Sequence, residues 1–218
     1  MKYLILTLLC LSALACKDPV MPSAKQATSG ENQWEKELQV NKSRDVWQRP
    51  SDVIDLLGDV SEYKIADIGA GTGFFSFRLL LRGASAIAID IDPRMLEIIE
   101  SFKQNLSSEM QTKLETRLAL PSDAKIEKDE VDIILIINTI GYIENRIEYL
   151  KQLYEVLPDG GKILIVDFKS RQLPVEAPSL EYRVPLFQLE QDLANSGFTS
   201  IESNDAILDY QYTVLASK

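Results

Sequence analysis

The chain has 218 residues, of which 45% are hydrophobic and 26% are charged, and its formal net charge at pH 7 is −10. This size fits one folded domain with a short extension, because a folded part of around 170 residues buries roughly 70% of its extended-chain surface. The acidity argues against nucleic acid as a partner, since such binding depends on basic patches that displace counterions from phosphates. The sequence has no histidine, so the most common general base of enzymes is absent.

The start of the chain has the pattern of an export signal. Lys2 supplies a positive charge, and the apolar stretch over residues 3–15 is too short to span a bilayer as a mature helix. The junction Ala15-Cys16 resembles the cleavage site of bacterial lipoproteins, in which the cysteine carries lipid. We therefore predict a signal peptide over residues 1–15, a lipid anchor at Cys16 and a location in the bacterial cell envelope. The alternatives are a plain secreted form, or an uncleaved helix and a cytoplasmic protein.

Residues 16–31 are predicted to be a flexible tether, because this segment contains prolines, serines and a glycine but too few apolar side chains to pack. Cys10 would be removed with the signal, so the mature chain would keep Cys16 alone and form no internal disulfide. Residues 32–218 then make up the folded domain. Membrane contact is expected through the lipid on Cys16 only, and the oligomeric state is left open.

The folded part alternates apolar runs with helix-like stretches, as in a doubly wound parallel sheet. Helices are predicted over residues 32–42, 46–58, 74–82, 93–105, 146–156 and 185–196. Strands are predicted over residues 64–68, 86–90, 114–119, 131–137, 162–168, 199–204 and 209–216. The expected fold is therefore α/β, with a mostly parallel, seven-stranded Rossmann-like sheet whose last strand is antiparallel.

A glycine-rich turn follows the first predicted strand, where residues 65–73 read Ile-Ala-Asp-Ile-Gly-Ala-Gly-Thr-Gly. Such a turn directs backbone amides and a helix N-terminus toward a ligand, and glycine permits an approach that a Cβ would block. Dinucleotide-binding turns read G-x-G-x-x-G, whereas here Phe74 takes the place of the last glycine. This spacing disfavours an NAD-dependent oxidoreductase. An ordinary strand-to-helix turn is the alternative.

The second predicted strand ends in a carboxylate, Asp90, roughly 20 residues after the turn, where dinucleotide-type folds place the group that accepts both ribose hydroxyls. A lone aspartate at a strand end is more often a solvated cap. Here, however, two motifs occur in order at the right separation. Asp90 is therefore the best single candidate for a ligand-binding residue.

These segments together resemble the class I S-adenosylmethionine (SAM) dependent methyltransferases. The stretch from Asp67 to Gly73, D-x-G-x-G-x-G, resembles motif I of that family, and residues 91–96 resemble its continuation, in which a proline begins the next helix. Residues 131–138 resemble the family's fourth strand, and residues 157–167 resemble its turn and fifth strand. The resemblance covers about residues 46 to 216 in a consistent order, and it implies SAM as the cofactor.

The resemblance also implies a cofactor site above the carboxyl ends of the first and fourth strands. Ile91 would pack on adenine, Asp123 would lie beside the adenine amine unless it is a plain turn aspartate, and Asn138 would lie near the methyl donor. Trp47 and its neighbours could cover the methionine end of SAM, with packing at the start of a helix as the alternative. The complete predicted set is Asp67, Gly69, Ala70, Gly71, Thr72, Gly73, Asp90, Ile91, Asp123 and Asn138.

The acceptor side departs from the family's pattern. Many similar small-molecule methyltransferases carry a histidine pair after the asparagine, where this chain has Gly141 and Tyr142. A carboxylate or Tyr142 would therefore have to accept a proton, unless the acceptor is already nucleophilic, so the catalytic residues stay unassigned. Methyl transfer requires orientation rather than a metal, and none is predicted. The proline-containing connection 169–185 is a candidate lid over the acceptor or a plain surface crossover.

We predict a SAM-dependent methyltransferase that acts on a small molecule or an envelope component. The Asn-Pro-Pro-Tyr signature used for planar amines is absent, so nucleobases and glutamine are disfavoured as acceptors. The alternative is a non-catalytic, envelope-anchored module that binds SAM or a nucleotide. Two features motivate it: export would place the domain where SAM is not expected to be abundant, and the acceptor motif lacks histidines.

Overall fold

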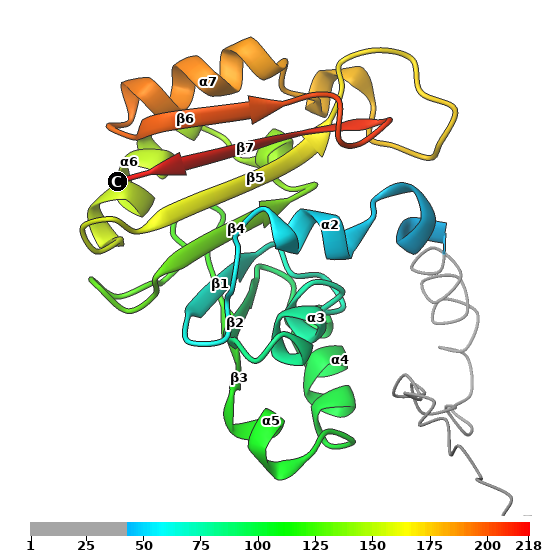
Figure 1. Cartoon of the computed structure of the whole chain (residues 1–218), viewed down its shortest axis with the longest axis vertical. Coiled ribbons are helices and arrows are strands. Elements are labelled where there is room, and N and C mark those ends of the chain that lie inside the picture. Colours follow the sequence, from blue (N-terminus) through cyan, green and yellow to red (C-terminus); the bar gives the residue numbers. More distant parts are fainter. Residues whose placement is uncertain (1–42) are drawn as a thin grey trace, which may run out of the picture.

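The computed structural model describes residues 43–218 (Figure 1). The predicted signal peptide over 1–15, the tether over 16–31 and the helix over 32–42 lie outside the described residues. Within the described part, no helix combines the length and the apolar character needed to cross a membrane.

One seven-stranded sheet organises the domain, with the strand order β3-β2-β1-β4-β5-β7-β6. Each pairing from β3 to β5 is parallel, and β7 runs antiparallel to both β5 and β6. The predicted fold class is therefore confirmed. The strands are β1 (Lys64–Ile68), β2 (Ser85–Asp90), β3 (Leu114–Leu118), β4 (Ile133–Ile137), β5 (Lys162–Phe168), β6 (Thr199–Asn204) and β7 (Gln211–Ser217).

Helices cover both faces of this sheet (Figure 1). One apolar layer packs α6 and α7 against the sheet, and the other packs α2, α3 and α4 against it. All five residues of β4 are buried because its side chains alternate between these two layers, as expected of a central parallel strand. The helices are α2 (Pro50–Asp55), α3 (Ser76–Leu81), α4 (Pro93–Lys103), α5 (Ser108–Thr112), α6 (Arg146–Val156) and α7 (Leu186–Asn195), with 3-10 turns η1 (Ile140–Tyr142) and η2 (Leu180–Tyr182).

The prediction of one continuous helix over 46–58 is wrong. Residues 43–47 are helical, the chain then leaves the helical conformation at Arg49, where φ is 48°, and α2 begins at Pro50. Proline has no amide hydrogen and restricts the residue before it, so it begins a helix more readily than it continues one.

The short helix α5 was not expected from the sequence, because five residues are too few to show a helical period. It begins where the Ser107 hydroxyl accepts a 3.3 Å hydrogen bond from the Met110 amide.

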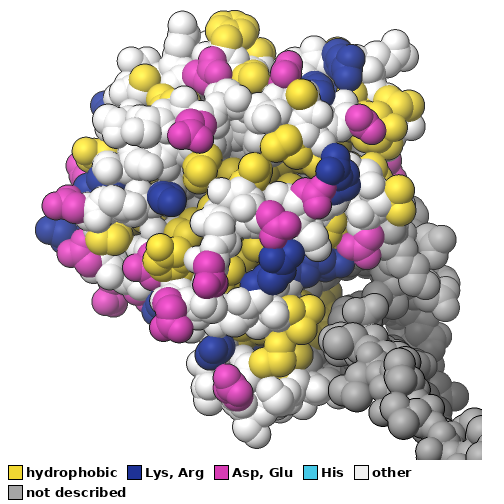
Figure 2. Space-filling model, viewed as in Figure 1, with side chains coloured by type: hydrophobic (Ala, Val, Ile, Leu, Met, Phe, Trp, Pro, Cys, Tyr) yellow, Lys and Arg dark blue, Asp and Glu magenta, His cyan; other side chains and the backbone are white. Residues whose placement is uncertain are grey.

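Charged side chains of both signs are interspersed over the visible face of the molecule (Figure 2). Several of them form surface ion pairs between elements, such as Arg82 with Asp55 at 2.6 Å. Exposed pairs of this kind contribute little to stability, about 0–1 kcal/mol each. The apolar layers on both faces of the sheet therefore carry most of the fold.

Candidate functional site

The glycine loop lies at the carboxyl end of β1, where the strand order reverses between β1 and β4. The backbone φ values of Gly69, Gly71 and Gly73 are 75°, 54° and 83°, which other residues rarely adopt. The amides of Gly69 and Ala70 donate to the Ile89 carbonyl at 2.8 and 3.0 Å, and so tie the loop to β2.

Of the three glycines in this loop, Gly71 faces open space, since a Cβ added there would meet nothing within 4 Å. A Cβ at Gly69 would lie 2.2 Å from Thr139 Oγ1, and one at Gly73 would lie 2.7 Å from the Phe77 ring. Gly69 and Gly73 are thus required by internal packing, whereas Gly71 leaves room for a ligand. Thr72 lies between Gly71 and Gly73 and is half-buried.

The Asp90 carboxylate connects the two predicted motifs. Its Oδ2 accepts a 2.8 Å hydrogen bond from the Gly71 amide, and its Oδ1 accepts a 3.0 Å bond from the Asp92 amide. Each carboxylate oxygen has a second lone pair, so capacity for two further donors, such as ribose hydroxyls, remains. The next side chain, Ile91, is 58% exposed and is free to contact a planar base.

Asp67 lies beneath the glycine loop rather than at its surface. It is 2% exposed, and its Oδ2 accepts a 2.6 Å hydrogen bond from the Ser76 hydroxyl at the start of α3. Burial raises the pKa of Asp67 to about 6, against the opposing effects of the Ser76 hydroxyl and the Arg44 charge. Its place in the structure is that of a support, which holds α3 against the end of β1.

Asp123 forms a local turn after β3. Its Oδ1 accepts a 2.7 Å hydrogen bond from the Lys125 amide, and its Oδ2 pairs with the Lys125 ammonium at 2.7 Å. These bonds lower the pKa of Asp123. The geometry fits the alternative of a turn aspartate, although the side chain is 45% exposed and its oxygens can still accept a further bond.

Asn138 follows β4 with a left-handed backbone, at a φ of 59°, a conformation that asparagine tolerates better than most residues. Its Oδ1 accepts hydrogen bonds from the amide groups of Gln211 and of Gln48, the latter at 3.3 Å. Both glutamines are fully buried. The structure thus places Asn138 at the predicted edge of the sheet but commits its side-chain oxygen to a buried network.

This network reaches the segment that precedes α2, where the sequence analysis singled out Trp47 but missed Gln48 and Arg44. Gln48 donates to Gln211 Oε1 at 2.9 Å across 163 positions of sequence, and Arg44 Nε donates to Gln48 Oε1 at 2.9 Å. The Arg44 guanidinium also lies 4.1 Å from the centroid of the Phe74 ring, directly after the glycine loop. Burial lowers the pKa of Arg44 to about 10. Residues 44–48 therefore pack over the carboxyl edge of the sheet.

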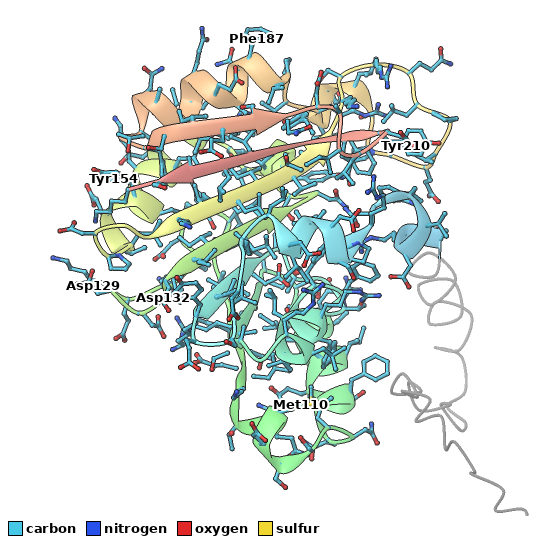
Figure 3. All side chains as sticks on the ribbon, in the orientation of Figure 1. Met110, Asp129, Asp132, Tyr154, Phe187 and Tyr210 are labelled. Atoms are coloured by element: carbon cyan, nitrogen blue, oxygen red, sulfur yellow. The ribbon has the colours of Figure 1, made fainter. Side chains whose placement is uncertain are left out.

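Aromatic side chains gather near the ends of β4 and β5 and the start of β7. Trp47 contacts Phe168, with ring centroids 5.6 Å apart, and Tyr210, with centroids 6.5 Å apart. Tyr210 lies at the start of β7 beside the 169–185 connection (Figure 3). Tyr142 of η1 stacks on Tyr182 of η2 at 5.0 Å, and both rings are exposed. The candidate lid thus contacts the turn that follows β4.

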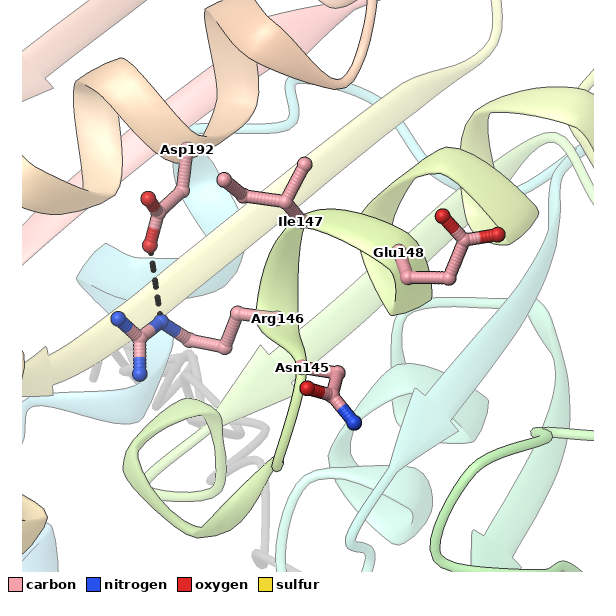
Figure 4. Close-up of a pocket in the computed structure, with 5 residues that line it drawn as sticks. All are labelled: Asn145, Arg146, Ile147, Glu148 and Asp192. Atoms are coloured by element: carbon pink, nitrogen blue, oxygen red, sulfur yellow. Dashed lines mark hydrogen bonds and ion pairs between the residues drawn. The ribbon is translucent and has the colours of Figure 1, made fainter.

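A cavity of about 440 Å³ opens between the start of α6 and α7 (Figure 4). Its buried carboxylate, Asp192, accepts from Arg146 Nε at 2.9 Å and from Gln188 Nε2 at 2.8 Å, so its charge is already paired. No predicted cofactor residue lines this cavity, and we assign it no ligand. The residues that line it are Asn145, Arg146, Ile147, Glu148 and Asp192.

Comparison with known proteins shows what this domain is similar to. Residues 66–163 match the family model described as a methyltransferase domain. The fold is similar to that of a SAM-dependent methyltransferase from Aquifex aeolicus, with a TM-score of 0.73 and 17% identity over 84% of this chain and 97% of the other. It is also similar to a phosphoethanolamine N-methyltransferase 2 from Haemonchus contortus in complex with SAM, with a TM-score of 0.64 and 15% identity over 79% of this chain and 52% of the other. The structural matches confirm the predicted fold, and the family model places a methyltransferase-type domain over residues 66–163.

Among curated sequences, the chain is 27% identical over 148 residues to a demethylmenaquinone methyltransferase from Lactococcus lactis. The match covers 64% of this chain and 55% of that protein. The chain spans about half the length of the curated relatives it matches.

Proposed function

We propose that this protein transfers the methyl group of SAM to a small-molecule acceptor. The observation that carries the proposal is the 2.8 Å hydrogen bond from the Gly71 amide to Asp90, which joins the glycine loop and the second motif at the crevice of the sheet. The methyltransferase-domain match over residues 66–163 supports it.

Each element of this edge has a part in the proposed reaction. The open side of Gly71 admits the cofactor, the spare lone pairs of Asp90 hold the ribose, and Ile91 packs on the adenine. Asn138 and the buried glutamines shape the end of β4 near the methyl donor. Methyl transfer is an in-line displacement, so the rate enhancement comes chiefly from holding donor and acceptor in line and away from water.

For the acceptor, we propose a planar aromatic hydroxyl compound of the quinol type. The name of the Lactococcus lactis relative points to a quinone substrate for that protein. In this chain, the Trp47, Phe168 and Tyr210 cluster and the stacked Tyr142–Tyr182 pair supply apolar ring surfaces on the acceptor side.

We also propose that a lipid on Cys16 holds the domain at a bacterial membrane. The apolar stretch over 3–15 and the Ala15-Cys16 junction support this location. A quinol-type acceptor with an apolar tail would reside in the same membrane.

Calorimetric titration of the purified protein with SAM, S-adenosylhomocysteine and NAD tests the cofactor. Transfer of a labelled methyl group to 1,4-dihydroxynaphthalene, kept reduced, tests the acceptor class. We expect SAM and S-adenosylhomocysteine to bind, NAD not to bind, and label to appear in the naphthalene. SAM binding without transfer to any aromatic hydroxyl compound would favour the non-catalytic binding module instead.

A further inference from the structure

Asp167 is a buried carboxyl group at the carboxyl edge of the sheet, the edge at which we propose that the acceptor binds. It lies near the end of β5, paired in register with Tyr212 of β7, and the adjacent Val166 accepts a 2.9 Å hydrogen bond from the Asn138 amide. The residue is 2% exposed. Asp167 therefore lies one strand away from the turn that follows β4.

One oxygen of this carboxyl group has no hydrogen-bond partner. Oδ1 accepts from the Phe168 amide at 2.6 Å, whereas Oδ2 is the single buried side-chain nitrogen or oxygen atom among residues 43–218 that lacks a partner. Leaving a buried acceptor unsatisfied costs about 1–3 kcal/mol, so such an atom in a folded protein calls for an explanation.

The other buried carboxylates of the described part are already committed. Asp67 bonds to Ser76 on the opposite face of the sheet, and Asp192 is paired with Arg146. The half-buried Asp90 fastens the glycine loop, and its spare lone pairs are assigned to the ribose. The whole chain has no histidine, and among the buried carboxylates of residues 43–218 Asp167 is the one with an oxygen that lacks a hydrogen-bond partner.

The turns η1 and η2 form the cover over Asp167. The amides of Ile140 and Gly141 in η1 face the carboxyl group and lower its pKa without reaching hydrogen-bond geometry. Gly141 packs so closely on η2 that a Cβ would lie 1.7 Å from the Tyr182 carbonyl oxygen. Beyond that contact, the layer consists of the exposed Tyr142–Tyr182 stack.

We propose, on the basis of the function proposed above, that Asp167 is the catalytic base, and that its Oδ2 takes the hydroxyl proton of an aromatic acceptor admitted beneath the Tyr142–Tyr182 pair. The acceptor's O–H bond breaks and its proton passes to Oδ2. The electron pair released forms the new bond to the methyl carbon, at the oxygen or at the conjugated ring carbon. The carbon–sulfur bond of SAM breaks with its pair on sulfur, so the products are the methylated acceptor, neutral S-adenosylhomocysteine and a protonated Asp167. For methylation at the ring carbon, the hydrogen on that carbon moves to the oxygen and restores the hydroxyl group. The reaction therefore still releases one proton, which is held by Asp167.

The charges around Asp167 are compatible with a base that works near neutral pH. Burial raises the pKa of Asp167 to about 6, and the amides of Phe168, Gly141 and Ile140 and the charge of Arg183 oppose this shift. The phenols that face it are Tyr142 from η1 and Tyr212 from β7, and burial together with the Asp167 charge raises the pKa of each. Both phenols therefore stay protonated and neutral while Asp167 titrates.

The test compares wild-type protein with Asp167→Asn, Asp167→Glu and the matched control Asp192→Asn, which removes an equally buried carboxylate from α7. For each, affinity for S-adenosylhomocysteine is measured by calorimetry, folding by thermal melting, and methyl transfer to 1,4-dihydroxynaphthalene from pH 5 to 9. We expect wild-type kcat to rise with pH through about 6. Asp167→Asn should keep cofactor affinity within about twofold, lose on the order of 100-fold in kcat and lose that rise, and Asp167→Glu should recover part of the rate. The Asp192→Asn control should keep the pH profile.

A second acceptor distinguishes loss of a base from loss of structure. A naphthol with two nitro groups, ortho and para to the hydroxyl, is ionised across this pH range and needs no base, so Asp167→Asn should methylate it at a rate close to wild type. An Asp167→Asn variant with unchanged kcat toward the naphthalenediol, or with equal losses toward both acceptors, would overturn the assignment of the base. If Asp167→Asn does not fold, the wild-type protein alone provides the test. A wild-type kcat that does not rise near pH 6 overturns the assignment of the base. A rise in kcat with the diol but not with the nitrated naphthol supports the assignment. Wild-type protein that binds no S-adenosylhomocysteine would instead refute the proposed function.

Discussion

The Gly71 amide donates a 2.8 Å hydrogen bond to Asp90 Oδ2. This one bond links the glycine loop after β1 to the end of β2, so the shape of the cofactor crevice depends on the side chain that we expect to hold the ribose. A change at Asp90 is therefore expected to remove a ligand contact and to loosen the loop together.

Asp90→Ala should weaken SAM binding by at least about 10- to 150-fold, because even one hydrogen bond to a charged group contributes roughly 1.5–3 kcal/mol. Calorimetry measures the change. The control is Asp159→Ala, since Asp159 is an exposed residue in the turn before β5, at the opposite edge of the sheet. Unchanged affinity in Asp90→Ala would show that the cofactor binds elsewhere.

Gly71→Val should abolish SAM binding, because its side chain would fill the open space beside the loop. A matched control is Gly160→Val, since Gly160 also has a positive φ, at 78°, and also faces open space. Both variants should lose about 1–2 kcal/mol of stability from the left-handed backbone, so their melting temperatures should fall alike. Only the first should lose the cofactor; equal binding by the two variants would remove Gly71 from the site.

The free energy of unfolding should fall as the pH rises from about 4 to about 7. Asp67 has a folded-state pKa raised to about 6, so the native state holds a proton that the unfolded chain has already lost, and this stabilisation disappears as the pH passes about 6. The shift corresponds to up to about 3 kcal/mol. Asp67→Asn should therefore show a shallower decline than wild type in chemical denaturation at a series of pH values. A decline of equal size in both proteins would contradict a raised pKa at Asp67.

Gln48→Leu should destabilise the protein by about 1–3 kcal/mol, because it leaves the buried Gln211 Oε1 without its donor and removes one of the two donors to Asn138 Oδ1. It should also weaken SAM binding, since the turn after β4 loses a support. Gln188→Leu is a suitable control, because Gln188 is a partly buried glutamine that donates to Asp192 away from the predicted cofactor residues. The network would have no part in the site if the two variants bound SAM equally well.

Cys16→Ser should release the protein from the membrane fraction or leave it as unprocessed precursor. Intact-mass measurement of the native protein checks the proposed anchor directly, with a lipid-modified Cys16 at the mature N-terminus as the expected result. An unmodified Cys16 at that terminus would indicate a plain secreted form. An intact Met1 would return the protein to the cytoplasm.

The sequence by itself determined the class of fold and predicted the edge of the sheet at which we expect the cofactor, because both depend on local patterns. Apolar runs such as residues 162–168 alternate with helical periods, and glycine spacing and a strand-terminal aspartate lie within about 20 residues of each other. Only the tertiary structure decided what those side chains contact. Asp67 is a buried support because α3 packs on its strand. Gln48 contacts Gln211 because β7 lies beside β5. Asp167 has one oxygen without a hydrogen-bond partner where η1 and η2 cover the end of β5. Such contacts join segments that the order of the strands brings together, and no local pattern records that order.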